Sequence, residues 1–152
     1  MRGLELKVPP PAVALVTAVL MWLVSRAATL AFEFPAGNIL AIGLAAAGII
    51  IAVAGVLTFR RARTTLNPTK PESSSSLVSW GIYRVTRNPM YLGLLLELTG
   101  WAIFLSNWLA FVFLPVFIVY IHRFQIVPEE RVLTSLFGGE FVAYQSRVRR
   151  WF

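Results

Sequence analysis

The sequence predicts an all-α integral membrane protein, a bundle of about four transmembrane helices followed by an amphipathic helix at the membrane interface. Three observations support this fold class. The chain has 152 residues, of which 57% are hydrophobic. Its mean hydropathy of +0.70 is too high for a soluble domain of this size. The apolar residues fall in four runs, and most basic residues flank these runs, as cytoplasmic anchors do.

The first two apolar runs predict two spans. The first covers about 11–31 and follows a proline triplet, which cannot lie inside a helix. A signal peptide is the competing interpretation, because Arg2 and Lys7 precede this run. The second span covers about 39–59 and is rich in Ala and Gly. Because small residues let membrane helices approach closely, we expect this helix to be a packing element.

A polar, basic segment at 60–89 predicts a cytosolic loop. Its prolines and its serine run, 73–76, argue against a continuous helix. The serine run is typical of a flexible linker. Because it lies only a few residues before a cluster of Tyr, Arg and Asn, a loop that covers a ligand is the alternative.

The third and fourth spans, about 90–105 and 108–127, are predicted to form a helical hairpin, because only residues 106–107 separate them. Each has roughly 16 to 20 residues, or about 24 to 30 Å of helix, enough to cross a membrane and return. The hairpin therefore brings Asn88 and Glu129 to the same membrane face. Function depends on this inference.

The distribution of charge predicts the topology. With four spans, the N-terminus, the 60–89 loop and the C-terminus lie on one side and carry thirteen of the fourteen Lys and Arg residues. Arg26 is the exception. The positive-inside rule makes this side cytoplasmic. Removing the first helix as a signal peptide would not move the loop or the tail, so the charge rule alone leaves both interpretations open.

Beyond the hairpin, Pro128 either stops the fourth span or restarts a helix at Glu129. Apolar residues then recur at three- and four-residue spacing, which predicts a cytosolic helix over 129–147. Gly138 and Gly139 can break this helix midway. The basic end of the chain is typical of an interfacial tail.

Composition excludes several kinds of chemistry. The chain has no cysteine and a single histidine, so we expect no metal site. It contains no Asp, which rules out a Ser–His–Asp triad, and it has no Gly-rich phosphate loop. The net charge of +7 could indicate nucleic acid, but the basic residues sit beside apolar runs, so we expect none. The bilayer is the expected partner.

The residues gathered at one membrane face offer both signs of charge, amide groups and aromatic rings. Pro89 biases Asn88 toward an extended conformation, which would leave its side chain free to face a ligand beside the unpaired start of a helix. A zwitterionic, aromatic and cationic ligand such as S-adenosylmethionine fits this set. A juxtamembrane turn with basic anchors is the alternative for the 81–93 segment, and helix capping is the alternative for the Glu129–Glu130 pair.

A resemblance appears in two motifs. The first, Gly81-Ile-Tyr-Arg-Val-Thr-Arg-Asn-Pro-Met-Tyr-Leu-Gly93, resembles the Arg-His-Pro-x-Tyr segment of the isoprenylcysteine carboxyl methyltransferases and their phospholipid methyltransferase relatives. The second, which begins Glu129-Glu130-x-x-Leu133 and continues to Tyr144, resembles that family's second motif. The order and separation of the motifs also match, over about 60–152. The resemblance implies one membrane methyltransferase domain, 1–152, of the bacterial type in the cytoplasmic membrane. It also implies S-adenosylmethionine as cofactor and a lipophilic or lipidated acceptor.

The resemblance also implies site residues. Arg123 and Glu129 would be catalytic, and Arg123 and Gln125 would bind the acceptor. Asn88 replaces the family's usual histidine, and Gln125 stands where some relatives place a substrate-orienting arginine. The implied cofactor-binding residues are Ser76, Leu77, Val78, Tyr83, Arg87, Asn88, Pro89, Met90, Tyr91, Glu129 and Glu130.

Other interpretations stay open. Arg123 is either an acceptor-orienting residue or a helix-end anchor whose side chain snorkels to the interface. Glu97, inside the third span, is either functional or protonated and packed. The acceptor is a prenylcysteine-like carboxylate, another small lipid, a phospholipid amine or a small thiol. A non-catalytic subunit that binds a lipid or a partner is the alternative to an enzyme, and a small transporter is disfavoured because the span centres hold few polar residues.

Overall fold

The computed structural model describes residues 5–28, 30–62 and 76–151. Its helices, in chain order, are α1 (Pro10–Ala27), α2 (Gly37–Arg61), the short 3-10 helix η3 (Gly81–Arg84), α3 (Pro89–Leu105), α4 (Trp108–Phe111), α5 (Phe113–Ile121), the π-helical turn η4 (His122–Ile126) and α6 (Val127–Arg147). The all-α prediction is confirmed. Most of the predicted serine run lies outside the described residues.

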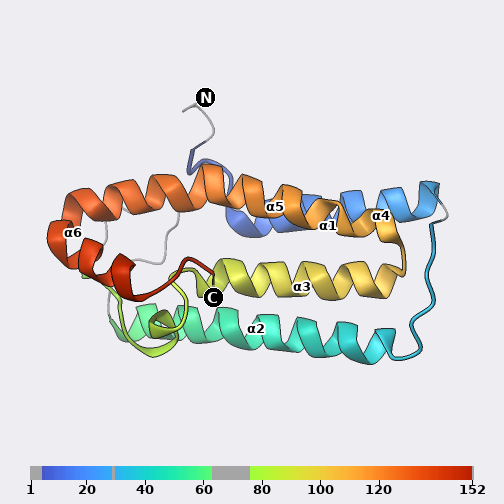
Figure 1. Ribbon diagram of the computed structural model, residues 1–152, viewed down its shortest axis with the longest axis horizontal. Coiled ribbons are helices and arrows are strands. Elements are labelled where there is room, and N and C mark those ends of the chain that lie inside the picture. The colour runs from blue at the N-terminus through green and yellow to red at the C-terminus, as the bar shows by residue number, and fades with distance from the viewer. Residues whose placement is uncertain (1–4, 29, 63–75, 152) are drawn as a thin grey trace.

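The helix α3 is the centre of the bundle (Figure 1). It packs most extensively against α2 and also contacts α1, α4 and α5. At the α2–α3 interface the two backbones approach closely, because a Cβ added to Gly93 would lie 2.6 Å from the carbonyl oxygen of Gly48. The prediction that small residues of α2 serve packing is therefore confirmed.

The turn between α3 and α4 closes the predicted hairpin. Ser106 adopts a left-handed conformation (φ 49°), and Asn107 accepts a hydrogen bond from the backbone N–H of Leu109 through Oδ1 at 2.9 Å. This is an N-cap, which satisfies a backbone donor at the start of a helix. Asn107 also donates through Nδ2 to the carbonyl oxygen of Ala28 at 2.6 Å. The hairpin turn is thus tied to the end of α1.

The opposite end of the bundle gathers the segments expected to lie on one face. Gln125 donates through Nε2 to the carbonyl oxygen of Val8, just before α1, at 2.7 Å. Tyr91, in the first turn of α3, donates its hydroxyl to Glu129 at 2.5 Å. The hairpin therefore brings together the two motifs, as predicted.

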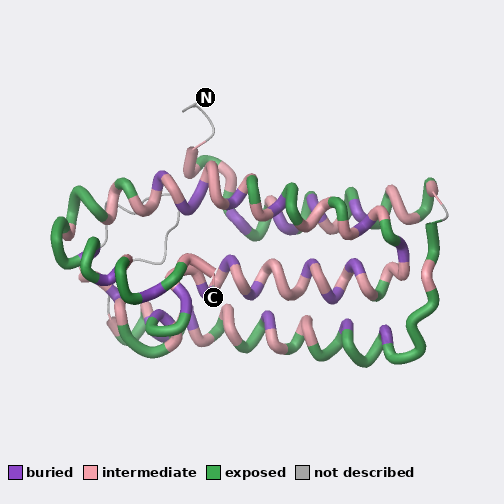
Figure 2. The backbone as a smooth tube through the Cα atoms, in the orientation of Figure 1, coloured by how far each residue is buried: buried purple, intermediate pink, exposed green. Residues whose placement is uncertain are grey.

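Three helices are long and apolar enough to cross a membrane: α1, α2 and the run Trp108–Arg147. The helix α3 is apolar but shorter, with 17 residues. Large apolar residues are also exposed on the bundle, such as Ile39 (78% exposed) and Ile42 (69% exposed) on α2. Figure 2 shows exposed residues along the whole length of this helix. Such a surface suits lipid, and it indicates a multi-pass membrane protein.

The boundary at Pro128 is a change of helix type. The sequence left open whether Pro128 stops the fourth span or restarts a helix at Glu129. A new α-helix, α6, begins at Val127, but it follows the π-helical turn η4 directly, so one helical run extends from Trp108 to Arg147. Proline normally interrupts a helix because it lacks an N–H, but here the π-helical turn η4 precedes it and Pro128 lies in the first turn of α6. The run has 40 residues, or about 60 Å, twice the thickness of a hydrocarbon core.

The predicted break at the glycine pair is confirmed. Gly138 has φ 50° and ψ −124°, outside the helical region, and it kinks α6. After the kink the chain folds back toward the start of α3 (Figure 1). The kink therefore places the last part of α6 beside the 81–88 segment.

Candidate functional site

The centre of the site is the contact between Tyr91 and Glu129. Tyr91 lies on α3 and is buried, and its hydroxyl donates to Glu129 Oε1 on α6. Burial raises the pKa of the Glu129 carboxyl to about 8; the hydrogen bond from Tyr91 opposes this shift and the neighbouring Glu130 adds to it. This carboxyl lies beyond the apolar half of the helical run. With its raised pKa it changes between the neutral and the charged form close to neutral pH.

The adjacent glutamate has a different environment. The Glu130 carboxylate lies between two guanidinium groups: Arg87 NH1 is 2.9 Å from Oε1, and Arg150 NH2 is 2.6 Å from Oε2. Arg150 also donates through Nε to both oxygens, at 3.0 and 3.2 Å. Glu130 was predicted to bind a cofactor directly. In the structure its carboxylate is ion-paired with Arg87 and Arg150.

Asn88 is also engaged. Its side chain was expected to be free, but Nδ2 donates to the carbonyl oxygen of Arg150 at 2.9 Å. Its backbone N–H donates to Thr86 Oγ1 at 3.2 Å, and Thr86 Oγ1 itself donates to the same Arg150 carbonyl at 3.1 Å. The backbone of Asn88 (φ −130°, ψ 56°) is not the expected extended conformation. The physical reason is the C-terminal segment, which lies alongside and supplies an acceptor.

An apolar cluster supports this end of the site. Val78 and Tyr83 are buried together with Phe141, Tyr144 and Val148 of the C-terminal region, and Leu77 packs against them. The Tyr144 hydroxyl donates to the carbonyl oxygen of Tyr83 at 2.7 Å, which fixes the 3-10 turn. These predicted cofactor residues thus also have a packing role.

The start of α3 is held against α2. Pro89 and Met90 are the side-chain neighbours nearest to Gly55, where an added Cβ would lie 3.1 Å from Pro89 Cγ and 3.2 Å from Met90 Cγ. The Tyr83 ring meets the Phe59 ring edge to face, with centroids 5.1 Å apart. Glu97 lies further along α3, beside Gly48, and is not part of this group.

Arg123 and Gln125, which were predicted to bind the methyl acceptor, contact the N-terminal arm, the described segment 5–9 that precedes α1. Arg123 NH1 is 3.0 Å from Glu5 Oε1, and Arg131 NH1 is 3.2 Å from Glu5 Oε2. Gln125 is fully buried and bonds Val8. Both predicted residues therefore have partners in the chain itself.

Several buried polar atoms of the predicted site residues make no hydrogen bond to any residue that the structure describes. They are Tyr83 Oη, Arg87 Nε and NH1 and Ser76 Oγ, with Gln125 Oε1 nearer the N-terminal arm. Buried polar groups in proteins are almost always paired, so each such atom needs an explanation. All five atoms belong to residues that the sequence assigned to the site.

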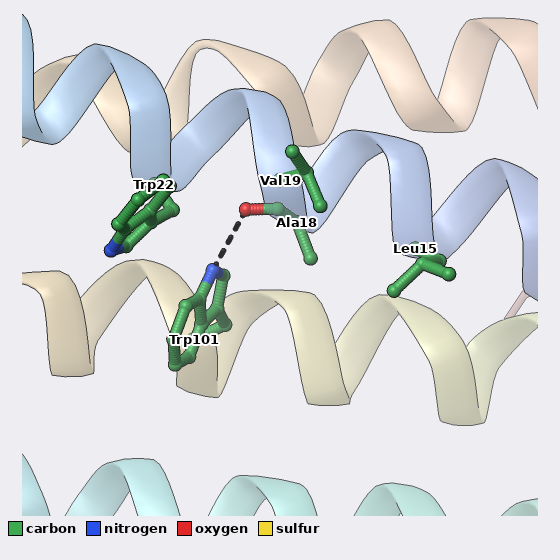
Figure 3. Close-up of a pocket in the computed structure, with 5 residues that line it drawn as sticks. All are labelled: Leu15, Ala18, Val19, Trp22 and Trp101. Carbon is green, nitrogen blue, oxygen red and sulfur yellow. Dashed lines mark hydrogen bonds between the residues drawn. The ribbon is translucent and has the colours of Figure 1, made fainter.

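An open apolar groove runs along α1 and α3 (Figure 3). Its volume is about 440 Å³, and its walls are formed by Leu15, Ala18, Val19, Trp22 and Trp101. Trp101 crosses the space between the helices and donates through Nε1 to the Ala18 carbonyl oxygen at 3.0 Å. Ten residues separate Trp101 from Tyr91 on α3, or about 15 Å. An apolar chain could lie here with its polar end toward Glu129.

Sequence reasoning missed Glu5, Thr86, Arg131 and Arg150. Arg131 was given no role, and Arg150 was assigned to an interfacial tail, because basic residues near an apolar segment are typical of such a tail. Their partners are 126 and 20 residues away, so no local spacing indicates them.

Comparison with known proteins gives the family. The phospholipid methyltransferase family profile matches residues 36–140. An uncharacterized protein of Haemophilus influenzae is 48% identical over 62 residues, which are 41% of this chain and 98% of that protein. Protein-S-isoprenylcysteine O-methyltransferase B of Arabidopsis thaliana is 32% identical over 104 residues, 66% of this chain and 51% of the relative.

The Saccharomyces cerevisiae protein-S-isoprenylcysteine O-methyltransferase is 35% identical over 83 residues, 53% of this chain and 34% of the relative. The matched region thus spans about half of the plant protein and about a third of the yeast protein. No solved structure matches. Because the family profile covers more than half of the chain and includes the start of both motifs, the chain belongs to the phospholipid methyltransferase family, whose members include isoprenylcysteine methyltransferase-like membrane proteins.

Proposed function

We propose that the protein is an S-adenosylmethionine-dependent methyltransferase of the membrane, acting on a lipophilic acceptor that partitions into the bilayer. The observation that carries this proposal is the contact between Tyr91 and Glu129, which joins the two family motifs across the hairpin. Arg87 Nε and NH1, which make no hydrogen bond to the described residues, fit a carboxylate, and the Glu129 carboxyl fits an ammonium group. The two groups thus match the two charged ends of the amino-acid moiety of S-adenosylmethionine.

The residues would divide the work as follows. Glu129, held by Tyr91, would bind the ammonium, and Arg87 the carboxylate. Tyr83 offers a buried hydroxyl that has no hydrogen-bond partner in the described part of the chain. The surrounding wall would be formed by Ser76, Leu77, Val78, Asn88, Pro89 and Met90. When bound, S-adenosylmethionine supplies a methyl group already activated by its sulfonium. The protein therefore needs only to align the acceptor and exclude water, and no covalent enzyme intermediate is required.

The acceptor side is proposed from the groove and the N-terminal arm. The groove would hold the apolar chain of a prenylcysteine-like carboxylate or another small lipid. Arg123 would orient an anionic head group, for which it would exchange its Glu5 partner, and Gln125 would support the same wall. A phospholipid amine or a small thiol is the alternative acceptor.

We further propose that α3 is the fourth span and that both termini are cytoplasmic. The described basic residues other than Arg26 lie on segments at the Tyr91–Glu129 end of the bundle, so the positive-inside rule places that end in the cytoplasm. Arg2, Arg63 and Lys70 lie outside the described residues.

The test has two steps. Isothermal titration of the detergent-purified protein should show saturable binding of S-adenosylmethionine, and folded protein that binds none at millimolar concentration would favour a non-catalytic lipid- or partner-binding subunit. A chase with a methyl-labelled donor in native membranes, followed by extraction, should then give a labelled lipid. Identification of that product would settle whether a carboxylate, an amine or a thiol is methylated.

A further inference from the structure

The C-terminal segment, 148–151, lies directly against the first family motif. The backbone N–H of Arg87 donates to the carbonyl oxygen of Arg149 at 3.0 Å. The next carbonyl, that of Arg150, accepts from Asn88 Nδ2 at 2.9 Å and from Thr86 Oγ1 at 3.1 Å. Trp151 packs on the edge of the main apolar core. The backbone of the segment is therefore fixed on both sides of Arg150.

The side chain of Arg150 then reaches the second motif. Its guanidinium takes both oxygens of Glu130, with the shortest contact, 2.6 Å, from NH2 to Oε2. Arg87 approaches the other oxygen of Glu130 through NH1 at 2.9 Å, but neither Nε nor NH1 of Arg87 makes a hydrogen bond to the described residues. Arg150 thus binds both oxygens of Glu130, whereas Arg87 forms an ion pair with Glu130 through NH1 but makes no hydrogen bond from Nε or NH1 to the described residues.

We propose that Arg150 is a positioning residue for cofactor binding: it holds the Glu130 carboxylate so that Arg87 keeps its donors for the carboxylate of the ligand. This inference rests on the proposed function. A planar guanidinium matches both oxygens of a carboxylate at once, which a lysine ammonium cannot do. Without the Arg150 side chain, Glu130 is free to rotate and bind Arg87 with both oxygens. Arg87 would then be satisfied internally and lost to the ligand.

The test uses two ligands and a matched control. The ligands are S-adenosylmethionine and its decarboxylated analogue, and the readout is the dissociation constant from isothermal titration of the full chain in detergent. The variants are Arg150→Ala and Arg150→Lys. Arg149→Ala is the control, because Arg149 is the exposed neighbour in the same segment and its side chain makes no hydrogen bond or ion pair with the described residues.

We expect Arg150→Ala to weaken the binding of S-adenosylmethionine about tenfold or more, as for the loss of one charge-assisted hydrogen bond. Arg150→Lys should weaken it less. The decarboxylated analogue should bind Arg150→Ala and wild type alike, because it has no group for Arg87. Arg149→Ala should match wild type for both ligands.

Three results would overturn the inference: equal losses for both ligands, an unchanged affinity in both Arg150 variants, or the same loss in Arg149→Ala. A purely structural role of Arg150 predicts the first of these. If Arg150→Ala does not fold, Arg150→Lys decides by the same two-ligand comparison. If folded wild type binds neither ligand, the proposed function itself fails, and the inference fails with it.

Discussion

Two clusters in this molecule have the same composition, one glutamate between two arginines, but different surroundings. The C-terminal cluster is Arg87–Glu130–Arg150, with side-chain exposures of 12%, 14% and 39%. The N-terminal cluster is Arg123–Glu5–Arg131, with exposures of 43%, 11% and 57%. In the first, a guanidinium and the carboxylate are both shielded from water. In the second, only the carboxylate is shielded.

The difference indicates different roles. A shielded charge that loses its partner cannot be rescued by water, so each member of the C-terminal cluster depends on the others. Exposed arginines remain hydrated, so we expect salt to weaken the ion pairs of the N-terminal cluster, which attach the segment before α1 to the rest of the protein. Equal composition therefore does not mean equal energy. Shielding from water therefore distinguishes the cluster proposed to take part in ligand binding from the one at the N-terminus.

The largest effect should follow removal of the shielded carboxylate. Glu130→Ala leaves Arg87 buried without a counter-charge, and we expect the free energy of unfolding to fall by about 3 kcal/mol. Glu5→Ala removes a carboxylate from two arginines as well, and it is the matched control with a much smaller effect. Thermal unfolding of both variants in one detergent measures the difference. Equal shifts in Tm would show that the two clusters do not differ in energy.

Glu129 extends the comparison, because its carboxyl is bound by the Tyr91 hydroxyl and not by an arginine of the described chain. Glu129→Gln keeps the size of the side chain and its acceptor for Tyr91, and it removes a carboxyl that burial holds protonated, so the variant should be more stable than wild type at neutral pH. Binding of S-adenosylmethionine should weaken by about 1–3 kcal/mol, because an amide replaces the charged partner of an ammonium. Isothermal titration measures this loss. Unchanged affinity in a folded Glu129→Gln protein would remove Glu129 from the site.

The two types of carboxyl should also respond to pH in opposite directions. Burial raises the pKa of Glu129 from 4.5 to about 8, so the folded protein holds a proton that the unfolded chain releases. This stabilisation is complete below pH 4.5 and is lost as the pH rises through 8, at up to about 1.4 kcal/mol per pH unit. Glu129→Gln should remove this slope.

For Glu5 the sign is reversed. The hydrogen bond from Arg123 lowers its pKa, so its contribution is present above the ordinary carboxyl range and is lost on acidification. Tm measured from about pH 3 to about pH 8 for wild type, Glu129→Gln and Glu5→Gln separates the two contributions, because the Glu5 window lies below the ordinary carboxyl pKa and the Glu129 window above it. A slope retained in Glu129→Gln would assign the titration to another group.

The smallest effect should be the response to salt. In about 1 M NaCl the screening length is about 3 Å, so the exposed N-terminal cluster should lose its contribution. The Tm difference between Glu5→Gln and wild type should therefore vanish in high salt, whereas the difference for Glu130→Gln should persist. A Glu130→Gln difference that disappears as well would mean that water and ions reach the C-terminal cluster.

The sequence predicted the frame of the fold well because its signals are local. Apolar runs located the helices within a few residues, and the two-residue turn at 106–107 predicted the hairpin that joins Tyr91 to Glu129. The clusters could not be predicted in the same way. Arg150 and Glu130 are 20 residues apart and meet only because Gly138 bends α6, and Glu5 meets Arg131 over 126 residues. In both clusters the sequence around the arginines does not reveal their glutamate partners, because a basic residue beside an apolar run is also typical of a membrane anchor.

The continuity of the helical run through Pro128 was left open for a related reason. A proline after an apolar run usually ends a helix, and the sequence contains no pattern that indicates a π-helical turn. In the structure the π-helical turn ends before Pro128, which lies in the first turn of α6, where a proline is tolerated, and the helical run continues.

The π-helical turn η4 also determines the directions in which the adjacent residues Glu129 and Glu130 point around the helix axis. A π-helical turn contains one residue more than an α-helical turn would, and one residue corresponds to about 100° of rotation. Everything after Ile126 is therefore rotated by that angle relative to an uninterrupted α-helix. In this phase Glu129 faces the Tyr91 hydroxyl and Glu130 faces the two arginines. With one residue fewer in the turn, Glu130 would move into the orientation of Glu129, so the chemical identity of each carboxyl is set by the winding of the helix before it.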